Sequence, residues 1–280
     1  MKEYPIVPPV DAAPDDLFEG HLWLLEKIDG AHLRFQLRES GLVQFGDRTR
    51  VYDDDVPEPY QHAVRHVRET LDREALRNAV DDVEDVVFFG AATHYQTIAY
   101  EWDRIPSFLG FDVWSADAEA FRPPDAVDAI FDGIGLESVN VLERERRARD
   151  FDPDSYTVPQ SAWYDGPAEG VVIRNKRGQR AKLLHPDAED ADEPSPVDAS
   201  AEELAARYAT RDRLEKLAAK LEDQGRPVAF ETLYDRVLED ILREAHRRLY
   251  HGGNGAEMDE FRSEVGALTR EFLRDRAGEP

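Results

Sequence analysis

The sequence contains no cysteine, so structural disulfides and zinc sites with cysteine ligands are excluded. It also lacks an apolar run approaching the roughly 18 residues that a membrane helix requires. The first residues, MKEYPIVPPV, contain prolines where a signal peptide has a continuous apolar segment. We therefore expect a soluble, cytoplasmic protein with no membrane partner.

Positive charge is scarce, and lysine is the scarcer of its two carriers. The chain has 35 lysine and arginine residues against 60 aspartate and glutamate residues, for a net charge of -25, and only six of the 35 are lysines. Such self-repulsion destabilises a compact state unless salt screens it. We therefore hypothesise a halophilic protein from a cytoplasm of very high salt. The charge alone argues against a nucleic-acid partner, although a salt-adapted surface hides a local basic groove from a net-charge count.

Short apolar and aromatic segments separated by turn residues fill residues 1–186. The segment PEPYQHAVRHVRETLDREALRNAV has helical periodicity. Strands with few helices between them predict antiparallel sheets and an α+β fold. The predicted strands are LWLLEKI and HLRFQLR on either side of Gly30, LVQFGDRTRVY, VEDVVFFGAA, SFLGFDVW, and the pair GVVIRN and RAKLLH joined by a KRGQ turn.

The composition changes after residue 186. Residues 187–199 are acidic and contain proline, with little to bury, and we interpret them as a linker. Residues 200–280 are predicted to form a small all-helical domain. Its first amphipathic segment is one run over 200–225 with Ser200 as its N-cap, and two further segments follow.

Lys27 follows the apolar run LWLLE and precedes Asp29 and Gly30. A lysine amine attacks a carbonyl or phosphoryl group only when it is neutral, so desolvation or nearby cations must favour the neutral form. Arginine cannot take this role, because it does not deprotonate in proteins. KIDG by itself is short and would occur by chance in many proteins. Taken alone, it favours an ordinary lysine at a strand end over a nucleophile, and Asp29 and Gly30 are also common in a hairpin turn.

The order of the later segments favours a specific family. EKIDG, FGDRTR, GFDVW, EGVVIRN and RAKLLHP follow one another over residues 1–186. This set resembles the covalent nucleotidyltransferase superfamily of ATP-dependent polynucleotide ligases and capping enzymes, and it is most similar to the nick-sealing RNA ligases. The resemblance implies an adenylation domain of antiparallel sheets with flanking helices, followed here by the helical domain.

The resemblance also implies roles for residues around the lysine. Lys27 would attack the α-phosphorus of ATP and carry AMP through a phosphoramidate bond. Asp29 and Gly30 would shape the turn that presents it, and the backbone of Glu26 and Ile28 would lie against adenine.

Further roles follow from the later motifs. Phe111 would stack on adenine, and Arg48 would grip a phosphate, for which a planar guanidinium is suited. Glu169 would hold Mg²⁺ or Mn²⁺, and Arg180 and Lys182 would neutralise charge on the phosphates. Each has a plainer reading: Phe111 as core, Arg48 as a solvated charge, Glu169 as a strand-edge residue and Lys182 as a snorkelling side chain.

Two departures from the family pattern matter, and a third conserves charge. Ala91 stands where the family has a glutamate that contacts the ribose, and Glu101 is a candidate to replace it. His32 stands where asparagine is common, within the predicted nucleotide site. Losing a charged hydrogen bond to the ribose costs about 1.5–3 kcal/mol. Arg180 replaces the usual lysine but conserves its charge.

The interpretation that unites these observations is an ATP-dependent RNA ligase that joins 3′-OH and 5′-phosphate ends. Its partners would be RNA ends or a nicked duplex, including an RNA/DNA hybrid, and we expect a monomer. The alternatives are a DNA ligase, a capping enzyme, or a degenerate ATP- or RNA-binding module. A DNA ligase usually carries an oligonucleotide-binding β-barrel where this chain turns helical.

Three weaker patterns remain. His62 and His66 are spaced as zinc ligands on a helix, but no third ligand accompanies them, which favours a surface helix. HGGNG, at residues 251–255, resembles a phosphate loop but is more typical of a turn between helices. The arginines of REAHRR suit either a nucleic-acid backbone or a solvated face.

Overall fold

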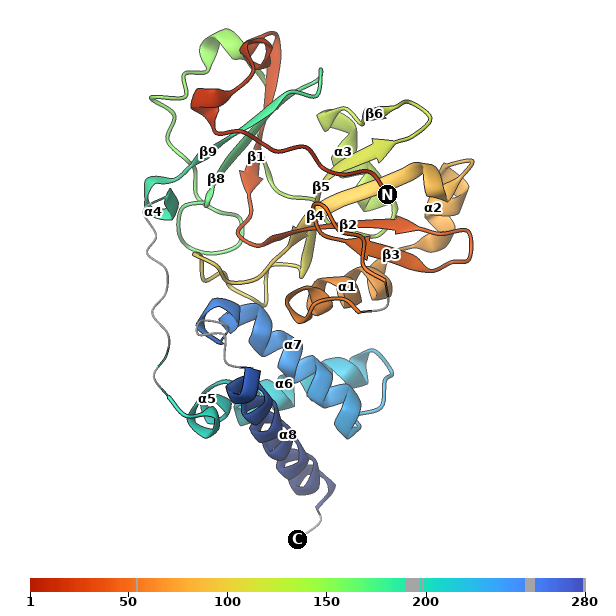
Figure 1. Ribbon diagram of the computed structural model, residues 1–280, viewed down its shortest axis with the longest axis vertical. Helices are drawn as coiled ribbons and strands as arrows, with labels where there is room; N and C mark the ends of the chain where they lie inside the picture. The colour runs from red at the N-terminus through yellow and green to blue at the C-terminus, as the bar shows by residue number, and fades with distance from the viewer. Residues whose placement is uncertain (54, 190–196, 198, 250–254, 279–280) are drawn as a thin grey trace. The chain divides into compact units, whose positions relative to one another are not determined.

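The structure is a computed structural model that describes residues 1–53, 55–189, 197, 199–249 and 255–278. The chain divides into two units, Met1–Ala191 and Asp192–Pro280, which are described separately (Figure 1). Most of the linker predicted over residues 187–199 lies outside the described residues. So do the first four residues of HGGNG.

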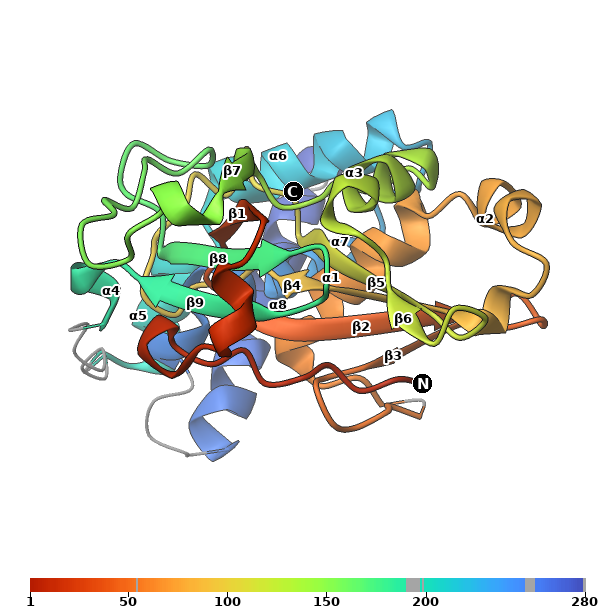
Figure 2. The ribbon, with the colours of Figure 1, turned by 90° about the horizontal axis from the view of Figure 1, so that it is seen from above.

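The first unit contains two antiparallel sheets, which confirms the predicted α+β fold (Figures 1 and 2). The strands of the four-stranded sheet, in spatial order, are β7 (Val141–Arg147), β1 (His21–Lys27), β8 (Gly170–Asn175) and β9 (Arg180–Leu184). Those of the five-stranded sheet are β3 (Val43–Gly46), β2 (Ala31–Leu37), β4 (Val86–Ala92), β5 (Phe108–Ser115) and β6 (Ala120–Phe121). Its helices are α1 (Glu58–Thr70), α2 (Arg73–Ala79), α3 (Pro124–Gly133) and α4 (Pro186–Glu189), with short 3₁₀ turns at Val10–Ala12, Asp15–Phe18, Val83–Asp85 and Ala148–Asp150.

The turn at Asp29 and Gly30 does not close a hairpin. β1 pairs with β7 and β8, whereas β2 pairs with β3 and β4, so the turn carries the chain from one sheet to the other. Gly30 has φ +153°, and a Cβ there would lie 2.3 Å from the carbonyl oxygen of Ala92. The hairpin interpretation is wrong because β1 and β2 do not pair with each other. The close approach of β4 explains why a glycine occupies this crossing.

β4 is the centre of the larger core. All seven of its residues are buried, as expected for the run VVFFGAA with helices against its sheet. The ring of Phe88 stacks on that of Phe35 in β2 at 4.8 Å, and Phe131 of α3 meets Phe88 edge-on at 5.8 Å. This core fixes the five-stranded sheet that carries one wall of the cavity described below.

The long helix predicted over PEPYQHAVRHVRETLDREALRNAV is instead two helices. α1 ends at Thr70, and Asp72 caps α2 by accepting hydrogen bonds from the backbone of Glu74 and Ala75 at 3.0 and 2.8 Å. An aspartate cap competes with helix continuation because its side chain satisfies the amides of a new first turn. The strands β6 and β7 and the helix α3 were not among the predicted elements.

The second unit is helical, with α5 (Ala201–Tyr208), α6 (Arg211–Asp223), α7 (Phe230–Leu249) and α8 (Gly255–Ala277). Ser200 caps α5 as predicted, in a reciprocal capping box with Glu203. The single run predicted over 200–225 is wrong, because Thr210 caps a new helix by accepting from the backbone of Arg213. Among the described residues, no helix of either unit is long and apolar enough to cross a membrane.

Arginines of the helical unit take part in ion pairs with its acidic residues. Arg213 bonds Asp240 at 2.6 Å and Glu244 at 2.5 Å, with its side chain 16% exposed. Arg276 bonds Glu222 at 2.5 Å across two helices. In these pairs, acidic residues of the same unit neutralise the arginines. This favours a solvated charged surface over a row of free cations that would bind a nucleic-acid backbone.

The charge excess makes a testable prediction about salt. We expect the melting temperature to rise by about 10 °C between 0.1 M and 2 M KCl, equivalent to roughly 3 kcal/mol for a unit of this size. The excess of 60 acidic over 35 basic residues provides the repulsion that salt would screen. Calorimetry checks it, with sucrose of equal osmolality as a control that does not screen charge. An equal melting temperature in dilute buffer and in molar KCl would reject the salt-adaptation hypothesis.

Candidate active site

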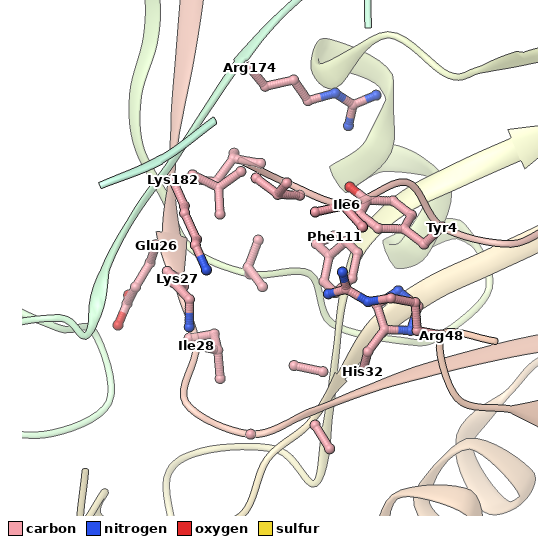
Figure 3. A pocket seen from close by; sticks show the side chains of 17 residues that line it. Tyr4, Ile6, Glu26, Lys27, Ile28, His32, Arg48, Phe111, Arg174 and Lys182 are labelled. Carbon is pink, nitrogen blue, oxygen red and sulfur yellow. The ribbon is translucent and has the colours of Figure 1, made fainter. Parts of the chain in front are cut away.

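A cavity of about 320 Å³ is lined by residues of both sheets (Figure 3). This volume is in the range of sites that enclose a small organic ligand. The four-stranded sheet contributes residues of β1, β8 and β9, and the five-stranded sheet contributes residues of β2, β4 and β5. Of the predicted site residues, the lining contains Glu26, Lys27, Ile28, Gly30, His32, Arg48, Phe111 and Lys182.

Lys27 lies at the end of β1, opposite Gly170 of β8. Its Nζ donates a hydrogen bond to Oε1 of Glu169, the residue before β8, and the two side chains are 25% and 13% exposed. Figure 3 shows the amine of Lys182 on the same side of the cavity. The amine of Lys27 therefore faces a carboxylate and a second amine within a largely enclosed space.

Glu169 is not itself in the lining but lies directly behind Lys27. Burial raises the pKa of its carboxyl group, against the opposing effect of the Lys27 charge. Its second oxygen, Oε2, is buried and has no hydrogen-bond partner among the described residues. An unpaired buried carboxylate oxygen has the chemistry of a hard-metal ligand.

The described residues contain no group of three or more histidine, cysteine, aspartate or glutamate side chains that could hold a metal ion. A zinc site at His62 and His66 is therefore not supported, and His62 is buried instead of lying on a helix surface. Mg²⁺ and Mn²⁺ need fewer protein ligands, since they commonly bind one or two carboxylates together with water and substrate phosphates. Glu169 fits that requirement.

Asp29 supports the turn after Lys27 from below the cavity. Its Oδ2 accepts hydrogen bonds from the backbone amides of Gln96, Thr97 and Ile98 at 3.0, 2.8 and 2.8 Å. Its own amide donates to the hydroxyl of Tyr100 at 2.9 Å. The side chain is buried and absent from the lining, so it shapes the turn by fixing it to the segment 96–100.

Glu26 presents its backbone to the cavity and points its side chain away from Phe111 (Figure 3). The carboxylate accepts hydrogen bonds from Ser161 Oγ at 2.6 Å, Asn140 Nδ2 at 3.2 Å and the Ala162 amide at 3.2 Å. Burial raises the pKa of this carboxyl, although those hydrogen bonds oppose the shift. The arrangement leaves only the main chain of Glu26 to contact a ligand.

Phe111 and His32 form an aromatic wall with Tyr4. The ring of His32 lies 5.5 Å from that of Phe111 and 5.1 Å from that of Tyr4. Burial, and then the charges of Arg48 and Arg34, lower the pKa of His32 to about 3, so its imidazole is neutral. Both ring nitrogens are buried without a hydrogen-bond partner in the described part of the chain. They offer one donor and one acceptor to a ligand.

Ala91 lies across from His32 on β4 and supplies no carboxylate. Glu101 does not replace it, because it is about half exposed, pairs with Arg104 at 3.0 Å and is absent from the lining. The structure thus offers no acidic side chain in the cavity lining except Glu26, whose carboxylate points away.

Arg180 is buried beside the cavity, outside its lining. Its Nη2 bonds Oδ2 of Asp112 at 2.8 Å, and Asp112 also bonds Nη2 of Arg174 at 2.9 Å and the hydroxyl of Tyr4 at 3.1 Å. Arg174 and Arg180 are cross-strand partners, so one carboxylate serves two neighbouring guanidinium groups. The cluster carries more positive than negative charge.

Arg174 lines the cavity, and the motif analysis did not assign it a role. Its Nε and Nη1 are buried and have no hydrogen-bond partner among the described residues. The sequence contained one indication of this position. Side chains alternate between the two faces of a strand, so Val172 and Arg174, two residues apart in β8, share the face that lines the cavity. Nothing in the sequence indicated that Asp112, more than 60 residues away, would hold it.

The N-terminal segment supplies the rest of the wall. Tyr4, Ile6 and Val7 line the cavity, and the amide of Lys182 donates to the carbonyl of Pro8 at 2.9 Å. Nη1 of Arg34 donates to the carbonyl oxygens of Met1 and Lys2. No motif marked this segment, whose contacts combine main-chain hydrogen bonds with the side chain of Tyr4.

Comparison with known proteins gives one family. The RNA ligase family model matches residues 20–185, more than half of the chain. No curated protein matches. An archaeal ATP-dependent RNA ligase structure is similar over 100% of this chain and 67% of its own length, with 18% identity and a TM-score of 0.49.

A variant of the Naegleria gruberi RNA ligase, solved with ATP and Mn, is similar over 69% of this chain and 59% of its own length. Its identity is 14% and its TM-score is 0.53, which shows a shared fold. The chain thus spans about three fifths to two thirds of the length of these structures.

Proposed function

The chain belongs to the RNA ligase family, and we propose that it is an ATP-dependent RNA ligase that works through a lysyl-AMP intermediate. The observation that carries the proposal is the position of the Lys27 amine. It bonds Glu169 and lies on the same side of the cavity as the Lys182 amine, and the opposite wall is aromatic. A nucleophilic amine beside cationic phosphate ligands and a stacking surface suits transfer of a nucleotide.

In the first step the neutral Nζ of Lys27 attacks the α-phosphorus of ATP. A P–N bond forms, and the bond to the oxygen that bridges the α- and β-phosphorus breaks, so pyrophosphate leaves with that electron pair. The amine proton passes to Glu169, which already accepts its hydrogen bond and whose pKa is raised by burial. Lys182 and Arg48 offset the charge of the phosphates.

Adenine lies against Phe111 and the backbone of Glu26 and Ile28. The unpartnered nitrogens of His32 and Arg174 then gain hydrogen-bond partners from the nucleotide. Arg180 acts indirectly, by holding Asp112 and with it Arg174. Because no acidic side chain replaces the missing ribose ligand at Ala91, we expect weaker selection for the ribose.

In the second step an oxygen of an RNA 5′-phosphate attacks the lysyl-AMP phosphorus. The P–N bond breaks, Lys27 leaves and regains a proton, and the 5′ end becomes adenylated. In the third step a 3′-hydroxyl oxygen attacks the 5′-phosphorus and its proton passes to solvent. The bond from that phosphorus to the oxygen bridging to AMP breaks, AMP leaves with the electron pair, and a phosphodiester remains. Mg²⁺ or Mn²⁺ held by Glu169 would supply charge neutralisation at the transferred phosphate.

Three rival functions can be separated from an ATP-dependent RNA ligase. A capping enzyme would take GTP, so nucleotide competition separates it from an ATP-dependent ligase. The described residues after β9 contain helices and no strand, which disfavours a DNA ligase with an oligonucleotide-binding barrel. A degenerate binding module, for which Ala91 and His32 argue, would bind ATP without forming a covalent adduct.

The experiment is a transfer assay in molar KCl with ATP labelled on the α-phosphate. We expect the protein to become labelled and then to pass the label to 5′-phosphorylated ends in a panel of substrates. The panel contains nicked RNA, an RNA/DNA hybrid, single-stranded RNA and nicked DNA, each with a 3′-hydroxyl or a 3′-deoxy end. Ends that lack the hydroxyl should accumulate as adenylated strands. A labelled protein that transfers to none of these ends would contradict the ligase proposal.

A further inference from the structure

The loop after β3 presents two arginines at the edge of the cavity. Asp47 Oδ1 accepts hydrogen bonds from the backbone amides of Thr49 and Arg50 at 2.8 and 2.7 Å, and its Oδ2 accepts from the hydroxyl of Tyr52 at 3.2 Å. Partial burial acts to raise the pKa of Asp47, but these hydrogen bonds outweigh it and leave the pKa lowered. The carboxylate is therefore ionised and holds the loop in one conformation.

Backbone contacts close the same loop. Gly46 pairs with Val51, and the amide of Tyr52 donates to the carbonyl of Phe45 at 2.9 Å. A Cβ at Gly46 would lie 2.3 Å from the carbonyl oxygen of Arg50, so only glycine permits this approach. The main chain of Arg50 is thus fixed on both its amide and its carbonyl side, which preorganises the side chain that follows from it.

The two arginines differ in what they reach. Both are exposed, but Arg48 lines the cavity and Arg50 does not. Among the described residues neither has an ion pair, in a chain with a net charge of -25 where Arg38, Arg104 and Arg146 each bond a glutamate. Arg50 is therefore an exposed cation without an ion pair among the described residues, outside the cavity lining but only two residues after Arg48.

Apolar side chains accompany this cation. The large hydrophobic residues that are exposed in the described part of the chain are Ile6, Leu42 and Val51, at 78%, 72% and 40%. Ile6 also lines the cavity, and Val51 follows Arg50 directly. Ile6 thus belongs to the cavity itself, and Val51 belongs to the loop that carries the cavity-lining Arg48. We call Ile6, Arg50 and Val51 the rim.

We propose that the rim binds the RNA strand that brings its 5′-phosphate to Lys27. The Arg50 guanidinium contacts a backbone phosphate, for which its planar fork is suited. Ile6 and Val51 lie against sugar and base faces, the apolar surfaces that a nucleic-acid strand exposes next to its phosphates. A metabolite small enough for the cavity would not reach an exposed arginine outside the lining. The inference rests on the proposed function, since it is an RNA strand that must approach Lys27 from outside.

The test is equilibrium binding of a short 5′-phosphorylated RNA, measured by fluorescence anisotropy over a series of KCl concentrations. We expect Arg50→Ala to weaken binding about tenfold and to reduce the slope of log affinity against log salt by about 0.7, the value of one phosphate contact on a single strand. Ile6→Ser should weaken binding without changing the slope. The matched control is Arg77→Ala, which removes another exposed arginine, from α2, that forms no ion pair with the described residues, and should leave binding unchanged.

Adenylation by labelled ATP, measured on the same variants, separates this inference from the proposed function. Arg50→Ala should label at the wild-type rate, because Arg50 lies outside the cavity lining. If Arg50→Ala binds RNA as Arg77→Ala does, or if it slows labelling as strongly as it weakens binding, the rim proposal is overturned. A wild-type protein that binds RNA through Arg50 but forms no adduct would instead count against the ligase chemistry and leave the rim supported.

Discussion

Replacing Lys27 with arginine is expected to abolish the covalent label from α-labelled ATP, a fall of at least about 10³-fold in rate. Arginine keeps the positive charge and can still pair with Glu169, so the electrostatic surroundings of the cavity change little. It cannot present a neutral nitrogen at any accessible pH. The substitution therefore removes the nucleophile and little else, and peptide mass spectrometry of the wild-type adduct should place AMP on Lys27.

Two control substitutions make this result specific. Lys176→Arg changes a lysine of the same unit that is 49% exposed and paired with Asp125 at 2.8 Å, and should label normally. Lys182→Arg keeps a cation at the cavity and should label at a reduced rate, because its proposed role is charge neutralisation. A label that survives in Lys27→Arg at a rate close to that of Lys176→Arg would reject Lys27 as the carrier of AMP.

The strands of the first unit were predictable because their residue patterns are local. VVFFGAA and GVVIRN are apolar runs between turn signals, and both are strands whose bounds match within a few residues. Their pairing was not predictable in the same way. Asp29 and Gly30 are compatible with a hairpin by composition, and it is the pairing of the flanking strands with β8 and β4, distant in sequence, that excludes one.

The predicted helix boundaries were wrong because they, too, rested on one local pattern. Periodicity continues across Asp72 and across Thr210, so apolar spacing alone predicts one helix where the structure has two. In both cases a short polar side chain accepts from the next turn's amides and starts a new helix. The capping residue inside each periodic run was the available signal of a new helix. The prediction gave more weight to the hydrophobic spacing.

The cavity residues, like the strands, were predictable where a local motif marked them and not where their position depends on residues far along the chain. The motifs indicated eight of the 17 lining residues, because each motif is a short run with its functional residue at a fixed place, as for Lys27 and Phe111. They did not indicate the N-terminal wall or Arg174, whose positions depend on main-chain contacts and on a partner far along the chain. Arg180 was expected to contact phosphate directly, whereas its guanidinium is engaged by Asp112.

The ion pairs of Asp112 with Arg180 and Arg174 lead to a second prediction, which concerns the stability of the first unit. We expect Asp112→Asn to lower the free energy of unfolding of the first unit by about 3–5 kcal/mol, the usual cost of breaking a buried ion pair from one side. Asp112 is fully buried, and Arg174 and Arg180 are only 2% and 5% exposed. Without the carboxylate, two desolvated guanidinium groups face each other across neighbouring strands with no negative charge between them. For a unit of this size, the melting temperature should fall by about 6–20 °C.

Differential scanning calorimetry checks this expectation, with Asp125→Asn as the matched control. Asp125 pairs with Lys176 at 2.8 Å, but both side chains are nearly half exposed, so the pair contributes little in water and its loss should shift the melting temperature far less. A binding measurement extends the argument, because Asp112 also holds the cavity-lining Arg174 and the hydroxyl of Tyr4. ATP affinity should therefore fall in Asp112→Asn even at temperatures where the variant is fully folded. Equal melting temperatures for the two variants would contradict the view that this carboxylate neutralises the buried arginines, and would require another negative charge to compensate them.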